Sequence, residues 1–98
     1  MLTEKEVIRV MSKITHPEID YSLLDLGMIK EVGAEQETVR ITMILPFPKV
    51  PIKDRLVQLV RDAIAKKDEA AEVEVSFATM NEAEQQEFTR KARAKWKS

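Results

Sequence analysis

Cysteine is absent from the 98-residue chain, and histidine occurs once, as His16. Without cysteine, the chain cannot form a disulfide, offer a thiolate nucleophile, or bind zinc or an iron–sulfur cluster through its own sulfur atoms. One histidine is too few for a multi-histidine metal site within a monomer. Glycine occurs twice, and neither glycine lies in a P-loop or dinucleotide-binding motif. These absences exclude most catalytic and cofactor sites, so we expect a protein that is not an enzyme and has no cofactor.

Charge and hydropathy narrow the range of partners. Sixteen basic against seventeen acidic residues give a net charge of −1, whereas nucleic-acid-binding proteins normally have a basic face. No apolar run approaches the roughly 18 residues of a membrane span. With 44% hydrophobic and 34% charged residues, the composition is typical of a folded globular protein. We therefore expect a single domain over residues 1–98 that is cytoplasmic and binds neither nucleic acid nor a membrane.

Three segments have the spacing of amphipathic helices. Thr3 and Glu6 form a capping box, and apolar residues on one helical face follow it, so the first helix is predicted over residues 3–14. Apolar residues at steps of three and four predict a second helix over residues 52–67. A last helix is expected to begin after Asn81. It is expected to dock through three apolar side chains at steps of four, which are Phe88, Ala92 and Trp96.

Three shorter segments are predicted to form strands. The first covers residues 28–32 and is expected to stop at Gly33, before a polar turn. The second covers residues 38–45, and the third contains the alternating apolar residues Val73, Val75 and Phe77. The first two strands form a hairpin, and the helix between the second and third makes that pair parallel. The predicted fold class is an α/β two-layer sandwich, a three-stranded mixed sheet with helices packed on it, in the order α-β-β-α-β-α.

The loop before the first strand carries the histidine and several acidic residues. His16, together with Glu18, Asp20 or Asp25, is a candidate general base or a weak candidate metal site. In the alternative interpretation, which we favour, Asp25 caps the turn before Gly27 through backbone amides. His16 is then a surface residue beside a proline.

A second loop, residues 46–51, contains three prolines and leads into the second helix. In one interpretation, Phe47 and Val50 form an exposed apolar contact patch. In the other, the loop is a rigid connection and Phe47 is buried in the core. Both interpretations remain open at this point. Three methionines are interpreted as core residues rather than as ligands, namely Met28, Met43 and Met80.

The stretch Leu23-Leu24-Asp25-Leu26-Gly27-Met28-Ile29 and the preceding Pro17-Glu18 carry a family resemblance. The chain resembles the iron–sulfur cluster assembly domain family, which includes SufT-like and PaaD-like proteins and the N-terminal domain of Mrp/ApbC-type ATPases. The resemblance extends from the first helix to about Phe77 and includes the strand over residues 38–45. Many members have Cys-Pro where this chain has Val50-Pro51, and an acidic residue where it has His16. An activity that needs the family's thiolate is therefore not implied here.

The resemblance implies an accessory or adaptor protein in iron–sulfur cluster assembly or delivery. Its expected partners are assembly proteins or apo-client proteins, and it acts by protein–protein interaction rather than by holding a cluster. Asp25, Thr42, Val50 and Pro51 are expected to lie together, if both loops meet at one end of the sheet. The residues that the resemblance assigns to partner binding are Glu18, Asp25, Gly27, Thr42, Phe47, Val50 and Pro51.

Three alternatives remain beside the adaptor hypothesis. In the first, the chain is a small metal-binding or acid–base enzyme that uses His16 with the loop carboxylates Glu18 and Asp25. In the second, it binds a cluster across a symmetric homodimer through His16 and carboxylates. In the third, it is a PaaD-like subunit of ring-oxygenation (phenylacetate) metabolism. The sequence does not decide between a monomer and a homodimer.

Overall fold

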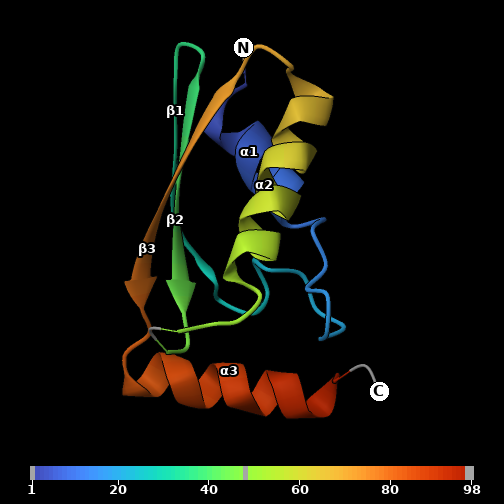
Figure 1. Ribbon diagram of the computed structural model, residues 1–98, viewed down its shortest axis with the longest axis vertical. Coiled ribbons are helices and arrows are strands. Elements are labelled where there is room, and N and C mark those ends of the chain that lie inside the picture. The colour runs from blue at the N-terminus through green and yellow to red at the C-terminus, as the bar shows by residue number, and fades with distance from the viewer. Residues whose placement is uncertain (1, 48, 97–98) are drawn as a thin grey trace.

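The computed structural model of the chain describes residues 2–47 and 49–96 (Figure 1). Three helices and three strands alternate in the predicted order α-β-β-α-β-α, so the predicted α/β fold class is confirmed. The elements are α1 (Glu4–Met11), β1 (Ile29–Glu35), β2 (Thr38–Leu45), α2 (Lys53–Lys67), β3 (Glu72–Thr79) and α3 (Glu82–Ala94).

The sheet has the strand order β1-β2-β3. β1 and β2 pair antiparallel, and β2 and β3 pair parallel from Thr38 with Glu72 to Leu45 with Thr79. The predicted hairpin and the predicted parallel pair are therefore confirmed. The third strand extends two residues beyond the last apolar residue of the predicted segment, because every residue of β2 finds a partner along it.

The first strand does not stop at Gly33, as the sequence suggested. Gly33 lies inside β1, opposite Arg40, and the ladder continues to the pair Glu35–Thr38. The turn is correspondingly tight, and Gln36 adopts a φ of 54° in it. Pairing with β2 thus outweighs the poor strand propensity of glycine, which is the reason why the prediction was wrong.

α1 and α2 cover one face of the sheet (Figure 1). The side chains of β2 that point to this face are buried, and they meet three fully buried residues of α2, namely Leu56, Val60 and Ile64. Burial of one side chain of this size contributes about 1.5 to 3 kcal/mol, so this layer contributes strongly to the stability of the fold. Met28, Met43 and Met80 are also buried, which confirms their predicted place in the core.

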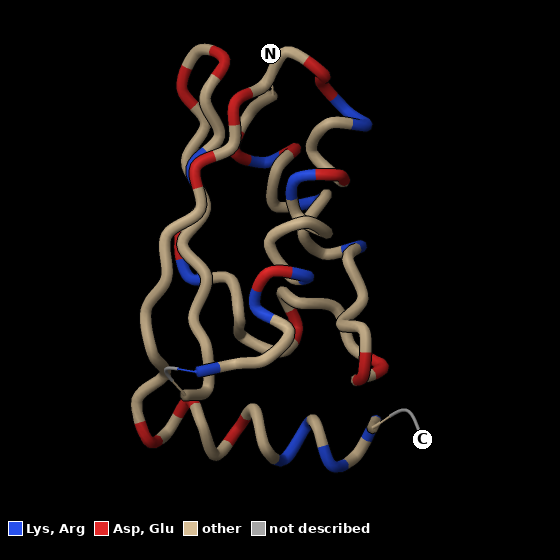
Figure 2. Tube along the Cα trace, in the orientation of Figure 1, with Lys and Arg blue, Asp and Glu red and all other residues tan. Residues whose placement is uncertain are grey.

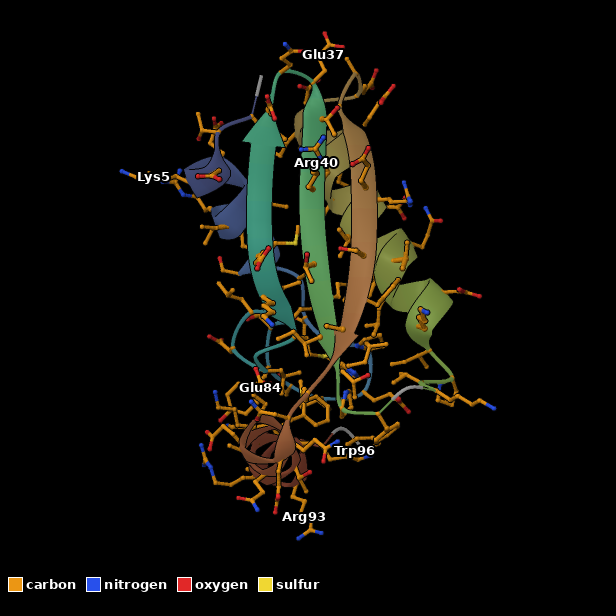
Figure 3. All side chains as sticks on the ribbon, turned by 90° about the vertical axis from the view of Figure 1, so that its left-hand side faces the viewer. Lys5, Glu37, Arg40, Glu84, Arg93 and Trp96 are labelled. Atoms are coloured by element: carbon orange, nitrogen blue, oxygen red, sulfur yellow. The ribbon has the colours of Figure 1, made fainter. Side chains whose placement is uncertain are left out.

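The opposite face of the sheet is polar and faces the viewer in Figure 3. Arg40, on the middle strand β2, has its Nε 3.0 Å from a carboxylate oxygen of Glu74, and a guanidinium nitrogen 3.7 Å from Glu35. Further along the same strand, the hydroxyls of Thr42 and Ser76 lie 3.1 Å apart. α3 does not pack on either face but lies across the end of the sheet where β2 and β3 finish (Figure 1).

α1 is shorter than predicted, because it ends at Met11 rather than at residue 14. The chain then folds back on itself: the N–H of Leu23 donates to the carbonyl of Ile14 at 2.8 Å, and Thr15 forms a β-bridge with Ser22. These bonds satisfy backbone groups that a longer helix would have used. The loop after α1 is therefore a small, backbone-bonded hairpin rather than an irregular connection.

Candidate functional site

A groove of about 280 Å³ opens at the end of the sheet. Residues of the loop after α1, of the proline loop (residues 46–51), of α3 and of Trp96 beyond it line this groove. It is lined by His16, Glu18, Phe47, Val50, Pro51 and Trp96, with five further apolar side chains between them. We call it the end groove. Its lining is mainly apolar, which is typical of sites that bind an apolar ligand or a side chain of a partner protein.

Two large aromatic side chains of the end groove are exposed to solvent. Phe47 is 53% exposed and Trp96 is 55% exposed, and both line the groove. The interpretation that Phe47 is buried in the core is therefore wrong: its side chain is exposed, and Val50 beside it is half-buried. Exposed aromatic side chains that gather at one hollow are characteristic of interaction sites.

The hydrogen bonds of His16 shape the loop wall of the groove. Its backbone N–H donates to the carbonyl of Tyr21 at 3.0 Å, and its ring Nδ1 accepts the backbone N–H of Glu18 at 2.9 Å. The side chain is 4% exposed, so the expectation of a surface residue is wrong. The ring turns inward because it is the acceptor for Glu18. Glu18 itself is exposed on the rim of the groove.

The proline loop is attached to its neighbours at both ends. The side-chain amide of Gln85, on α3, donates to the carbonyl of Pro46. At the other end, the N–H of Lys53 donates to the carbonyl of Val50 at 3.0 Å, so that Val50 and Pro51 lead directly into α2. Val50 is half-buried and forms part of the groove wall.

Asp25 and Gly27 lie outside the lining of the end groove. The N–H of Asp25 donates to the hydroxyl of Ser22 at 3.0 Å, and Gly27 has a φ of +74°. Ser22 therefore caps this turn, in place of the Asp25 carboxylate that the sequence suggested. Ser22 is buried inside the turn, where its side chain, shorter than that of aspartate, reaches the N–H of Asp25. The carbonyl of Asp25 accepts a hydrogen bond from the Lys91 ammonium at 2.5 Å, which attaches the turn to α3.

Thr42 is also separate from the groove. It lies on the polar face of the sheet, where its hydroxyl meets that of Ser76. The strand alternates, so Ile41 and Met43 on either side of it point into the core instead. Of the seven residues that the resemblance assigns to partner binding, the structure thus brings together Glu18, Phe47, Val50 and Pro51.

The described residues contain no group of three or more His, Asp or Glu side chains that would hold a metal ion. In the end groove, His16 and Glu18 are the polar side chains, and Asp25 does not join them. Over the same described ranges, none of the helices is long and apolar enough to cross a bilayer.

Sequence reasoning did not place Ile19 or Trp96 in the site. Ile19 sits in a polar stretch, and only the hairpin of the loop turns it inward, to 1% exposure. Trp96 was expected to dock the last helix, but it lies beyond the end of α3 and remains half-exposed beside Ile19. The one available signal was a large aromatic residue at the end of an amphipathic helix.

The structure is thus a small α/β domain whose connecting loops line a largely apolar groove. A family comparison makes this more specific. The model of the family described as "Iron-sulfur cluster assembly protein" matches residues 4–77, most of the chain. The chain belongs to this family.

Three related proteins have names that agree with this family. The chain is 32% identical over 75 residues to an iron–sulfur cluster carrier protein of Synechocystis sp., a match that covers 76% of this chain and 21% of the relative. It is 36% identical over 61 residues to an Fe–S protein maturation auxiliary factor of Porphyromonas gingivalis. This match covers 60% of this chain and 57% of the relative. A carrier protein of Deinococcus radiodurans is 26% identical over 74 residues, covering 76% of this chain and 21% of the relative. The chain thus spans about a fifth of each carrier protein.

The fold also resembles a solved structure. The crystal structure of a domain of unknown function, DUF59, from Bacillus anthracis superposes with a TM-score of 0.73. The match covers 93% of this chain and 88% of the other, at 19% sequence identity. It supports the fold, including a part of the chain beyond residue 77 where the family model ends.

Proposed function

We propose that this chain is an accessory protein of iron–sulfur cluster assembly or delivery in the cytoplasm, and that it acts as a non-catalytic adaptor. The end groove binds an iron–sulfur assembly protein or an apo-client protein. The observation that carries the proposal is the pair of exposed aromatic side chains, Phe47 and Trp96, at an apolar groove in a chain of this family.

The chemistry of the groove favours an adaptor over a carrier. A cluster is normally held by cysteine thiolates, and the chain has no cysteine. Val50, at the family's cysteine position, offers a branched apolar side chain to the groove. An apolar wall of this kind gains free energy by removing a partner's apolar surface from water, and it supplies no ligand for iron.

The aromatic side chains are suited to anchor such a partner. Residues that dominate the energy of protein interfaces are enriched in tryptophan and tyrosine, and they lie in pockets from which binding excludes water. Phe and Trp each bury about 150 to 250 Å² when covered. Phe47 and Trp96 are both half-exposed here, so much of that area is still available for a partner.

The proposal is tested by measuring binding of the purified chain to the iron–sulfur scaffold and carrier proteins of the same organism. Phe47→Ser is expected to weaken binding at least tenfold. The matched control is Ile8→Ser, because Ile8 is 44% exposed on α1 and does not line the groove. Absence of binding to every assembly protein, or equal losses in both variants, would show that the end groove is not the adaptor surface.

Two further variants define how far the surface extends. Asp25 lies on the loop that also forms one wall of the groove, so we expect Asp25→Ala to weaken binding, by less than Phe47→Ser. Thr42 lies on the polar face of the sheet, and Thr42→Ala is expected to leave the affinity unchanged. A strong loss with Thr42→Ala would move the interaction to the open face of the sheet.

A further inference from the structure

The chain does not continue as a helix after Ala94. Trp96 forms an isolated antiparallel β-bridge with Ile19, and the N–H of Asp20 donates to the carbonyl of Lys95 at 2.8 Å. We call Lys95–Trp96 the α3 extension. It lies against the loop that follows α1 and forms this β-bridge with one wall of the end groove.

The bridge directs the tryptophan into the groove. Because the hydrogen bond joins Asp20 to Lys95, Ile19 and Trp96 are the pair without direct hydrogen bonds, and side chains of such pairs approach each other closely on the same side. Both side chains line the end groove. The α3 extension thus has its backbone bonded to the loop and an aromatic side chain at an apolar hollow, and a peptide that binds by strand addition makes the same two kinds of contact.

The α3 extension is attached much more weakly than α3 itself. α3 is fixed by its Asn81 cap, by the bond of Gln85 to the proline loop, and by the bond of Lys91 to the carbonyl of Asp25. The N–H of Lys95 still donates to the carbonyl of Lys91, but the contact of the extension with the loop is the one bridge with its hydrogen bond, and its tryptophan is 55% exposed. Isolated strand pairs of this size are marginal in water, and segments with few buried contacts open first. The extension can therefore leave the loop while α3 stays in place.

The charges of the two segments are complementary. Glu18 and Asp20, on the loop, are exposed carboxylates, whereas Lys95 follows the basic second half of α3. Figure 2 shows the basic residues of that half of α3 opposite the acidic turn of the loop after α1. The loop edge with its apolar hollow is thus matched to a segment in which an aromatic residue has basic neighbours.

We propose that the α3 extension occupies a peptide-binding edge of the end groove, and that a partner segment of the same chemistry displaces it. The occupant is an extended polypeptide segment with an aromatic side chain flanked by lysine or arginine. It pairs with the backbone of residues 18–20 and places its aromatic ring beside Phe47. This inference rests on the proposed adaptor function and specifies which part of a partner the groove binds.

The probe is a synthetic peptide that copies residues 92–98, Ala-Arg-Ala-Lys-Trp-Lys-Ser. It is added to the full chain carrying Trp96→Ala, in which the extension has lost its anchor. Because the chain has one tryptophan, the peptide then provides the only tryptophan emission. We expect a blue shift of that emission on binding, and an affinity at least tenfold higher than for the wild-type chain, measured by anisotropy of a labelled peptide.

Matched variants identify the contacts. In the Trp96→Ala chain, adding Phe47→Ser or replacing Glu18 and Asp20 by lysine is expected to weaken peptide binding at least tenfold. Adding Ile8→Ser is expected to leave the affinity unchanged. Equal affinity for the wild-type and Trp96→Ala chains would overturn the proposal, and so would undiminished binding of a peptide with alanine in place of tryptophan.

A second measurement uses the wild-type chain and does not depend on the folding of the variant. A peptide with phenylalanine in place of tryptophan is added at saturating concentration, and quenching of Trp96 fluorescence by acrylamide is followed. Displacement of the extension must increase the quenching constant, and an unchanged constant contradicts the proposal. If the peptide fails while Phe47→Ser still weakens binding to an assembly protein, the adaptor function stands and the displacement mechanism is rejected.

Discussion

The ring Nδ1 of His16 accepts a hydrogen bond from the backbone N–H of Glu18, at a distance of 2.9 Å. This bond fixes the turn that carries Glu18 to the rim of the end groove and Ile19 to its interior. The histidine therefore has a structural role that needs neither a metal nor a substrate. The same geometry makes the shape of the groove depend on one buried ring.

Replacement of His16 tests this role. His16→Leu removes the acceptor and leaves the partly buried N–H of Glu18 without its partner, so we expect a loss of about 1 to 3 kcal/mol in the free energy of unfolding. His16→Asn retains a side-chain oxygen that can accept the same N–H, and its loss should be clearly smaller. Urea unfolding of both variants measures the difference. If both are equally destabilised, the bond to Glu18 contributes little to the stability of the loop.

Gly27 is the other residue of the loop whose role can be separated from binding. Its φ of +74° lies in the left-handed region, and a Cβ added there would meet no atom within 4 Å. Gly27→Ala is therefore expected to cost roughly 1 to 2 kcal/mol through backbone strain alone. Gly27→Asn should cost less, because asparagine adopts this conformation more readily.

Binding measurements with the same variant separate structure from recognition. Gly27 does not line the end groove, so Gly27→Ala should keep its affinity for the peptide and for assembly proteins at temperatures where it is fully folded. A tenfold loss of affinity in the folded variant would mean that the turn itself contacts the partner.

The order of elements could be predicted from the sequence because its signals are local. The capping boxes at Thr3 and Asn81 are both present, and the alternation in β2 matches its buried positions. The predictions were wrong where backbone pairing with another segment decides the local structure. Gly33 continues a strand because Arg40 is opposite it, and the loop after α1 forms a hairpin because Ile14 and Leu23 are bonded.

In the candidate site, too, the residues with a local sequence signal could be predicted and those placed by contacts between segments could not. Phe47, Val50, Pro51 and Glu18 were chosen from the sequence, and they meet in the end groove. The wall opposite them was not foreseen. It depends on α3 lying across the end of the sheet, which the amphipathic pattern of the helix does not specify. Trp96 reaches the groove only through its bridge to Ile19, which no local pattern predicts.

The cap of α3 controls this wall. The side chain of Asn81 accepts the N–H of Glu84 at 2.8 Å, and the Glu84 carboxylate accepts the N–H of Asn81 at 2.9 Å. Asn81→Ala should lower the free energy of unfolding by about 1 kcal/mol, and Asn81→Ser should restore most of it. Thermal unfolding followed by circular dichroism compares the two variants. An unchanged midpoint for Asn81→Ala would show that the capping box does not stabilise α3.

A titration on α3 gives a prediction with a defined sign. The Arg90 guanidinium donates to Glu87 and holds the pKa of that carboxyl below its usual value of 4.5. Since the folded pKa is lowered, the pair stabilises the folded chain above pH 4.5, and this contribution is lost as the pH falls through the lowered pKa. Arg90→Gln should raise the pKa of Glu87 in a carboxyl NMR titration and reduce the loss of stability in acid. A pKa that does not move in Arg90→Gln contradicts the assignment.

Lys91 connects α3 to the loop and so holds the two sides of the end groove together. Its ammonium donates to the carbonyl of Asp25 at 2.5 Å and lies 5.9 Å from the centre of the Tyr21 ring. Lys91→Met keeps most of the apolar part of the side chain and removes both interactions, together with an ion pair to Glu87 at 4.0 Å. Because the side chain is only 26% exposed, the lost hydrogen bond is expected to cost about 1 kcal/mol in unfolding free energy.

The consequence for the groove follows from the same contact. Without the bond to Asp25, the second half of α3 is still packed through the buried Ala92 but loses its hydrogen bond to the loop, so this half and Trp96 should move more freely. We expect acrylamide to quench Trp96 more strongly in Lys91→Met than in the wild-type chain. Lys91→Arg, which retains the charge and a donor, is the control and should behave like the wild type. Equal quenching in Lys91→Met and the wild type would show that the bridge to Ile19 alone is sufficient to hold the α3 extension.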